Sequence, residues 1–312
     1  MKKSGLILFM IGMILTLSGC GQGQSAMSAM AQRLEEDTRY ICQEIGIRPT
    51  GTGKEQETCD WLERELEEMG FSYEAGTLVR SPFEGFPGMY SENLMSVCNP
   101  EGQGDIWCVV AHYDSIEASP GARDNAASVA ILLEIARTVS QWDADTDAQL
   151  RMIFLGSEEN GYHGSRAYLE SLPKEDLVRH RGAFNLDISA ATAGEGQLVC
   201  CTLGGETEQG YRSGDFLGPA ENGITRAVTQ ACEMLYGEQP AVVHGGESDH
   251  VTFHQWEIDS ANVCWRRVED GLPVLPPEYH RMDDVPETID YETAVMTTEC
   301  VLGAVELVTG WN

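Results

Sequence analysis

The chain has 312 residues, with 50 Asp and Glu against 20 Lys and Arg and a formal net charge of −30. This balance argues against a nucleic-acid ligand and against electrostatic binding to anionic lipid, because both require clustered cationic side chains. Most of the acidic residues are therefore expected on a solvated surface, and only a few can take part in chemistry.

The N-terminal residues have the pattern of a bacterial lipoprotein signal. Lys2 and Lys3 precede an apolar run over residues 6–17, which is too short to span a bilayer comfortably. Leu17-Ser18-Gly19-Cys20 follows and resembles a lipobox, in which Cys20 becomes the lipidated first residue of the mature protein. An ordinary secretory signal with a chance cysteine is the alternative.

Three regions follow from this pattern: a signal peptide over 1–19, a small polar tether over 20–30, and one domain over 31–312. The expected location is extracytoplasmic, with a lipid anchor at Cys20 in the bacterial cell membrane. About 280 residues remain for one hydrophobic core, which is near its usual upper limit. The cysteines include no Cys-x-x-Cys, which argues against a structural zinc. Cys200 and Cys201 are adjacent and Cys108 lies in an apolar run, so most cysteines are interpreted as buried apolar groups with no more than one or two disulfides.

The periodicity of apolar residues predicts helices that alternate with strands. Helices are expected over 31–47, 54–69, 126–139, 161–172, about 220–236 and 287–309. Strands are expected over 71–80, 93–98, 106–111, 150–155, 183–186, 196–203 and 257–265. This order predicts an α/β fold, a three-layer α/β/α sandwich around a mostly parallel mixed sheet.

Histidine and acidic residues lie at the ends of these apolar runs, where the functional sites of such sheets are found. His112 follows the run over 106–111, and Asp114 lies two residues further on the same face of an extended chain. Asp114 can accept the second ring N–H of His112 and so fix its tautomer. A structural histidine is the alternative for His112 considered alone.

Three further acidic positions have both a structural and a functional interpretation. Asp124 lies in a Gly-rich turn before a helix, where it can be an N-cap or a carboxylate bridging two metal ions. Glu158 and Glu159 project in opposite directions, so that one can bind metal while the other acts as general base. Asp187 directly follows a buried run and needs a partner.

The last imidazole position stays open on the residues alone. Ser248-Asp249-His250 and His280 compete for it, and His244 and His254 are weaker candidates. Imidazole and carboxylate ligands without thiolate are typical of a catalytic zinc site rather than a structural one.

Several short fragments occur in one order along the chain: Arg48-Pro49-Thr50-Gly51-Thr52, His112-Tyr113-Asp114-Ser115, Gly121-Ala122-Arg123-Asp124-Asn125-Ala126, Glu158-Glu159-Asn160-Gly161, Gly164-Ser165-Arg166, Asn185-Leu186-Asp187, Ser248-Asp249-His250-Val251-Thr252-Phe253, and His280 with Asp284. Together they resemble metallopeptidase family twenty-eight, the di-zinc aminopeptidases, which also includes glutaminyl cyclases and glutamate carboxypeptidases. The resemblance implies a zinc-exopeptidase-like fold and two zinc ions.

By position, the resemblance implies that one zinc is bound by His112 and Asp187, the other by Glu159 and His280, and that Asp124 bridges them. It also implies Glu158 as the general base, Asp114 behind His112, and a cis peptide bond between Asp124 and Asn125. Ser248-Asp249-His250 would border the substrate pocket.

The preferred interpretation is a membrane-tethered, extracytoplasmic di-zinc exopeptidase, an aminopeptidase that removes N-terminal residues from a peptide substrate. A glutaminyl-peptide cyclotransferase with one zinc is the nearest alternative, and a carboxypeptidase on the same scaffold is another. An inactive peptide-binding lipoprotein is the alternative from a different class. The presence of Asn125 and of the stretch over 159–166 favours the peptidase.

Overall fold

The computed structural model describes residues 28–192, 195–203 and 221–311, so the expected signal peptide and Cys20 lie outside the described residues. The helices are α1 (Ala29–Arg39), α2 (Gly53–Glu68), α3 (Ala127–Val139), α4 (His163–Ser171), α5 (Lys174–Arg179), α6 (Gly223–Tyr236), α7 (His250–Gln255) and α8 (Tyr291–Thr309). The strands are β1 (Leu78–Phe86), β2 (Met89–Cys98), β3 (Ile106–His112), β4 (Gln149–Leu155), β5 (His180–Asn185), β6 (Ala191–Thr192), β7 (Gln197–Thr202), β8 (Ala241–His244), β9 (Asp259–Glu269), β10 (Leu272–Val274) and β11 (Ile289–Asp290).

The main sheet has the strand order β1-β2-β4-β3-β5-β9-β7-β8, and β10 pairs with β9. The central strands β4, β3, β5 and β9 are parallel to one another. Strand β2 is antiparallel to β4, and β7 is antiparallel to β9. Parallel pairing is thus concentrated at the centre of a mixed sheet, whose flanks are antiparallel.

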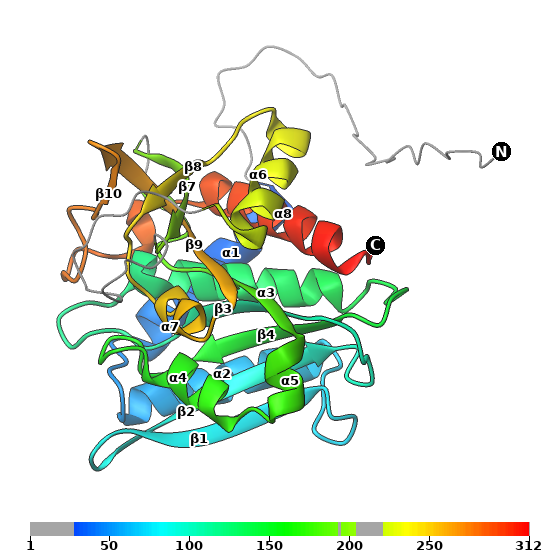
Figure 1. Cartoon of the computed structure of the whole chain (residues 1–312). Helices are drawn as coiled ribbons and strands as arrows, with labels where there is room; N and C mark the ends of the chain where they lie inside the picture. Colours follow the sequence, from blue (N-terminus) through cyan, green and yellow to red (C-terminus); the bar gives the residue numbers. More distant parts are fainter. Residues whose placement is uncertain (1–27, 193–194, 204–220, 312) are drawn as a thin grey trace, which may run out of the picture.

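Helices cover both faces of the sheet, as Figure 1 shows, which confirms the predicted three-layer α/β/α fold. Helices α1, α2, α3, α6 and α8 contribute to one apolar core, and α4, α5 and α7 pack against the other face. Strand β3 is covered on both sides, and its sequence is therefore a continuous apolar run. Val109 faces the α3 side, and Cys108 and Val110 face the side of α4 and α7.

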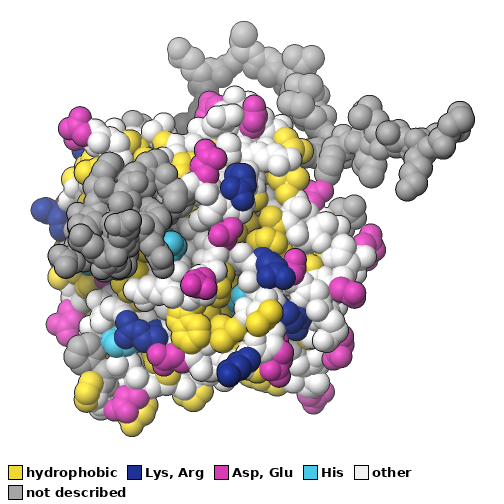
Figure 2. All heavy atoms as spheres, in the orientation of Figure 1, with side chains coloured by type: hydrophobic (Ala, Val, Ile, Leu, Met, Phe, Trp, Pro, Cys, Tyr) yellow, Lys and Arg dark blue, Asp and Glu magenta, His cyan; other side chains and the backbone are white. Residues whose placement is uncertain are grey.

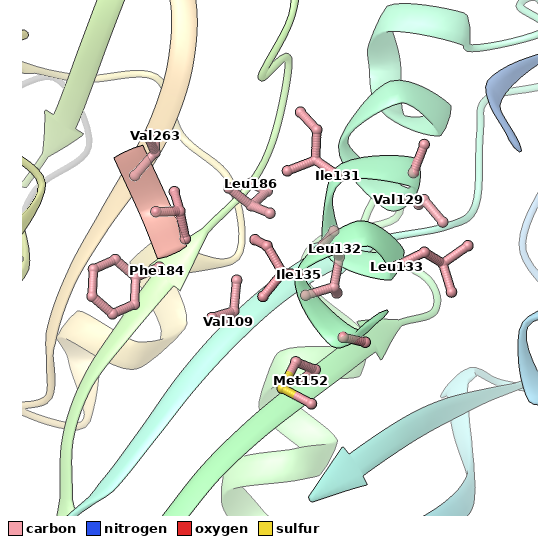
Figure 3. Close-up of a cluster of buried hydrophobic side chains, with 14 of the residues drawn as sticks. Val109, Val129, Ile131, Leu132, Leu133, Ile135, Met152, Phe184, Leu186 and Val263 are labelled. Carbon is pink, nitrogen blue, oxygen red and sulfur yellow. The ribbon is translucent and has the colours of Figure 1, made fainter. Parts of the chain in front are cut away.

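Helix α3 shows how burial holds these layers together. Ile131, Leu132 and Ile135 are fully buried and lie in one cluster with Val109 of β3 and Phe184 of β5 (Figure 3). Removing a side chain of this size from water contributes about 1.5–3 kcal/mol. Helix α3 begins directly after the turn that carries Asp124, so its packing also positions that turn.

Side-chain caps explain several helix starts. Thr52 accepts a hydrogen bond from the backbone N–H of Glu55 at the start of α2, and Asp290 accepts one from Glu292 at the start of α8. The capping Asp290 places the start of α8 later than the predicted residue 287; residues 286–288 form a 3₁₀ turn instead. Helix α1 begins at Ala29, within the segment expected to be a tether, because Ser28 caps it.

The first predicted strand, over 71–80, is wrong at its start. Ser72 to Gly76 form a turn, in which the N–H of Thr77 donates to the carbonyl of Ser72, and β1 begins only at Leu78. Gly76 has φ +67°, a left-handed conformation that suits glycine. The apolar Phe71 before this turn is buried without belonging to a strand.

Three expectations from composition concern the cysteines, the acidic side chains and membrane-spanning segments. The nine cysteines among them are free thiols and nearly all are buried, as expected. Acidic side chains are dispersed over the face shown in Figure 2, with a few basic ones among them. Of the helices in the described part of the chain, none has both the length and the apolar composition needed to cross a membrane.

Candidate metal centre

His112 lies at the carboxyl end of β3, where it faces two carboxylates. Its Nε2 is 3.3 Å from Oδ1 of Asp124 and 3.7 Å from Oδ1 of Asp187. Asp187 follows β5, the parallel neighbour of β3, and Asp124 lies in the turn before α3. The fold therefore brings together side chains from the end of β3, the end of β5 and the turn before α3.

A second imidazole approaches the same carboxylate from the opposite side. Nε2 of His280 is 3.3 Å from Oδ2 of Asp124 and 3.1 Å from Oε2 of Glu159. Each oxygen of Asp124 thus faces a different imidazole, which is the arrangement expected of a carboxylate that bridges two metal ions. The ring of Tyr279 stacks on His280 with centroids 3.7 Å apart and so supports its orientation.

Ligand atoms gather in two overlapping groups, each within 4.8 Å. One group contains His112, Glu158 and Asp187, and the other contains His112, Asp124 and Glu159. Glu158 is therefore close enough to the first group to bind a metal ion or to face a water molecule beside it. Its expected role as general base, and the expected ligand set, stay predictions.

Unpartnered atoms at this site identify the chemistry that fits it. Buried polar atoms normally have a hydrogen-bond partner, but Oε1 of Glu159 and Oδ1 of Asp187 have none, and Nε2 of His280 lies near two carboxylates without hydrogen-bond geometry to either. Imidazole nitrogen and carboxylate oxygen are the usual ligands of a catalytic zinc ion. The donor set and its unused atoms therefore fit zinc.

The buried ionisable groups of the site shift one another's pKa values. Burial alone would lower the pKa of His280, but Asp124 and Glu159 raise it to about 10. Burial, together with Asp124, raises the pKa of Glu159 to about 7. Burial raises the pKa of Glu158 well above its usual value; His112 opposes this shift and Asp249 adds to it. A bound cation would relieve this repulsion among buried carboxylates.

Asp114 connects His112 to the acidic pair, in the position expected behind the imidazole. Its Oδ1 lies 3.3 Å from Nδ1 of His112 and accepts a hydrogen bond of 3.1 Å from the N–H of Glu158. Its Oδ2 accepts from the N–H of Glu159 and from the hydroxyl of Thr50. Asp114 therefore aligns the imidazole and the backbone of both glutamates.

Asn125 forms hydrogen bonds that link the carboxyl end of β3 to the chain that follows β5. Its Nδ2 donates to the carbonyls of Leu186 and His112, and its Oδ1 accepts from the N–H of Ile188. The peptide bond between Asp124 and Asn125 is cis, as the resemblance implied. These contacts give Asn125 a structural role that the residue pattern did not reveal.

Of the competing histidines, the structure places His280 beside Asp124. His250 is buried at the start of α7, whereas Nε2 of His280 lies 3.3 Å from Oδ2 of Asp124. Burial lowers the pKa of His250 to about 3, which keeps its ring neutral. The adjacent Asp249 is also buried, and neither of its oxygens has a hydrogen-bond partner.

A family model described as Peptidase family M28 matches residues 93–305 of this chain. Among curated proteins, the chain is 32% identical over 225 residues to "Aminopeptidase YwaD" of Bacillus subtilis, a match that covers 71% of this chain and 46% of that protein. The chain thus spans less than half the length of that relative.

Solved structures share the fold. A zinc aminopeptidase from Bacillus subtilis aligns with a TM-score of 0.75 and 20% identity, over 89% of this chain and 94% of that one. A glutaminyl cyclase of Bacteroides thetaiotaomicron aligns with a TM-score of 0.68 and 19% identity, over 88% of this chain and 97% of that one. The predicted fold class is thereby confirmed.

Proposed function

The chain belongs to peptidase family M28, and on that premise we propose that it is a zinc-dependent aminopeptidase with two metal ions. The observation that supports this most is the position of Asp124, whose two oxygens face His112 and His280 at 3.3 Å each. One ion would be held by His112 and Asp187, and the other by Glu159 and His280.

The chemistry follows from the residues around these positions. Zinc, when bound, supplies Lewis acidity that polarises a carbonyl and lowers the pKa of water to about 7. Glu158 accepts the proton of the attacking water and passes it to the amine that leaves. Asp114 holds His112 and the backbone of Glu158 in place. The raised pKa of Glu158 suits a group that must both take and release a proton.

The similarity in fold to a glutaminyl cyclase keeps a one-zinc cyclotransferase as the nearest alternative. Donor groups on both sides of Asp124, His112 with Asp187 and His280 with Glu159, favour the peptidase, because together they provide positions for two ions. A glutaminyl anilide separates the two activities: a peptidase releases free glutamine and the aniline, whereas a cyclase releases ammonia and keeps the anilide bond.

Zinc removal should abolish hydrolysis reversibly. The purified protein is expected to contain about two zinc equivalents, because one carboxylate lies between two imidazoles. Dialysis against a chelator should remove the metal and the activity on a panel of aminoacyl anilides, and added zinc should restore both. Activity that survives at a zinc content near zero would exclude the proposal, and a fully loaded protein that cleaves nothing would favour a peptide-binding lipoprotein.

We also propose that the protein is anchored outside the cytoplasm by lipid at Cys20. The support is the run Leu17-Ser18-Gly19-Cys20 after an apolar segment. Expressed in a bacterium, the unmodified chain should be found in the membrane fraction and incorporate labelled fatty acid. Cys20→Ala should lose the label and leave the membrane, while Cys42→Ala, which changes a buried cysteine, should retain both.

A further inference from the structure

Arg266 of β9 is a buried cation without a counter-charge among the described residues. Only 4% of its surface is exposed. Its Nε has no hydrogen-bond partner, and Arg266 forms no ion pair with a carboxylate of residues 28–192, 195–203 and 221–311. A charge removed from water is costly unless it is paired. The packing of the fold therefore does not by itself explain why a charged arginine occupies this buried position.

The other buried arginines show what a structural role requires. Arg48 donates to the carbonyls of Tyr113, Pro120 and Gly121. Arg123 pairs with Glu278 at 2.7 Å, and Arg151 pairs with Asp176 at 2.6 Å. Each of these guanidinium groups donates to a carboxylate or a carbonyl, although Nε of Arg123 also lacks a partner. For Arg266 no such acceptor is found among the described residues.

The register of the sheet shows where Arg266 lies. Asn262 of β9 pairs with Asn185, the last residue of β5, so the residues that follow it extend past the carboxyl end of β5 while they stay paired with β7. Side chains alternate along a strand, which places Arg266 on the same face as Asn262. Oδ1 of Asn262 accepts from the N–H of Asp187 at 3.1 Å, and the N–H of Trp265, next to Arg266, donates to the carbonyl of Ile188 at 2.8 Å. This part of β9 therefore lies beside the segment that carries Asp187.

Cysteines of the same sheet and carboxylates of the metal centre both surround Arg266. Burial opposes its charge, while Cys264 most of all, and then Asp187, Cys201 and Asp124, raise its pKa. If Asp187 and Asp124 hold metal, their charge is shared with the ions. The guanidinium then remains as an uncompensated positive group at the edge of the site.

We propose that Arg266 forms a subsite for a carboxylate of the substrate, beside the metal centre. A guanidinium fork binds a carboxylate with two parallel hydrogen bonds, which gives both strength and selectivity. The acidic side chain of an N-terminal Asp or Glu supplies such a group, and the C-terminal carboxylate of a dipeptide supplies the same chemistry. This inference rests on the proposed aminopeptidase function.

Anilide and dipeptide substrates distinguish these two sources in the unmodified, zinc-loaded protein. A subsite for the N-terminal side chain predicts a kcat/KM at least about tenfold higher for glutamyl than for glutaminyl 4-nitroanilide, since a charge-assisted hydrogen bond is lost in the amide. A subsite for the C-terminus predicts the same ratio for Leu-Leu against Leu-Leu amide. A ratio near one in both pairs would overturn the proposal.

Substitution of Arg266 tests whether this residue forms the carboxylate subsite. Arg266→Gln should lower kcat/KM for the carboxylate-bearing substrate by about 10- to 100-fold and leave its neutral counterpart within about twofold. Arg267→Gln is the matched control, because Arg267 is the next residue, is 52% exposed and pairs with Glu269 at the surface. Arg266→Lys should keep part of the preference. An equal loss on charged and neutral substrates would assign Arg266 a structural role and overturn the subsite.

Two further measurements separate failure of the subsite from misfolding of the variant and from failure of the proposed function. If Arg266→Gln does not fold, the unmodified protein decides: equal inhibition by free L-glutamate and L-glutamine, together with equal kcat/KM for Leu-Leu and Leu-Leu amide, contradicts the subsite. If the unmodified protein hydrolyses neither neutral nor acidic substrates, the proposed function fails rather than the subsite. Calorimetric binding of L-glutamate against L-glutamine, and of Leu-Leu against Leu-Leu amide, to the zinc-loaded protein then decides the subsite independently.

Discussion

Replacing Asp124 by alanine should empty both metal positions at once. Its two oxygens each lie 3.3 Å from a different imidazole, so no other side chain in the described structure occupies the same place between them. The zinc content should fall from about two equivalents to nearly none, and kcat by about 10³–10⁴-fold, because the metals contribute several kcal/mol to the transition state. Elemental analysis and anilide hydrolysis measure the two effects.

Asp283→Ala is the matched control for this substitution. Asp283 is also an aspartate near His280 in the sequence, but 62% of its side chain is exposed and it pairs with Arg281 at the surface. It should keep zinc and activity. An Asp124→Ala protein that still holds two zinc equivalents would show that the carboxylate does not bridge the ions.

Glu158→Gln should keep zinc and lose turnover. The amide preserves the shape of the side chain but cannot accept a proton, so kcat should fall by about 10²–10⁴-fold, the usual contribution of a positioned acid–base group. The folded state should be retained, because the substitution removes a buried carboxyl whose pKa burial already raises. Kinetics with anilide substrates and elemental analysis on the same preparation measure both properties.

Glu159→Gln is the internal comparison, since the neighbouring glutamate is expected to bind metal. Oε2 of Glu159 lies 3.1 Å from His280, and its Oε1 has no partner. An amide is a poorer zinc ligand, so this protein should lose metal occupancy together with activity. If Glu158→Gln lost zinc while Glu159→Gln retained it, the two roles would be reversed. Unchanged hydrolysis in both would place the active site elsewhere.

Much of the fold could be predicted because its elements are defined by local periodicity. The apolar run over 106–111 indicates a strand covered on both faces, and β3 is covered on both faces. The flanking elements were harder, because an edge strand such as β1 has an exposed side and a weak pattern. There the turn from Ser72 to Gly76 decided where the strand begins.

At the site, the sequence alone determined which residue types were available and that they follow buried runs. It left His250 and His280 as competitors, and only the tertiary structure brings His280 to 3.3 Å from Asp124. Similarly, the sequence does not distinguish Arg266 from its neighbour Arg267, yet Arg266 is 4% exposed and the side chain of Arg267 is 52% exposed. The physical reason is the range of the interactions: strand and helix patterns arise between residues close in the chain, whereas a metal centre and a buried charge depend on contacts between segments that only packing brings together.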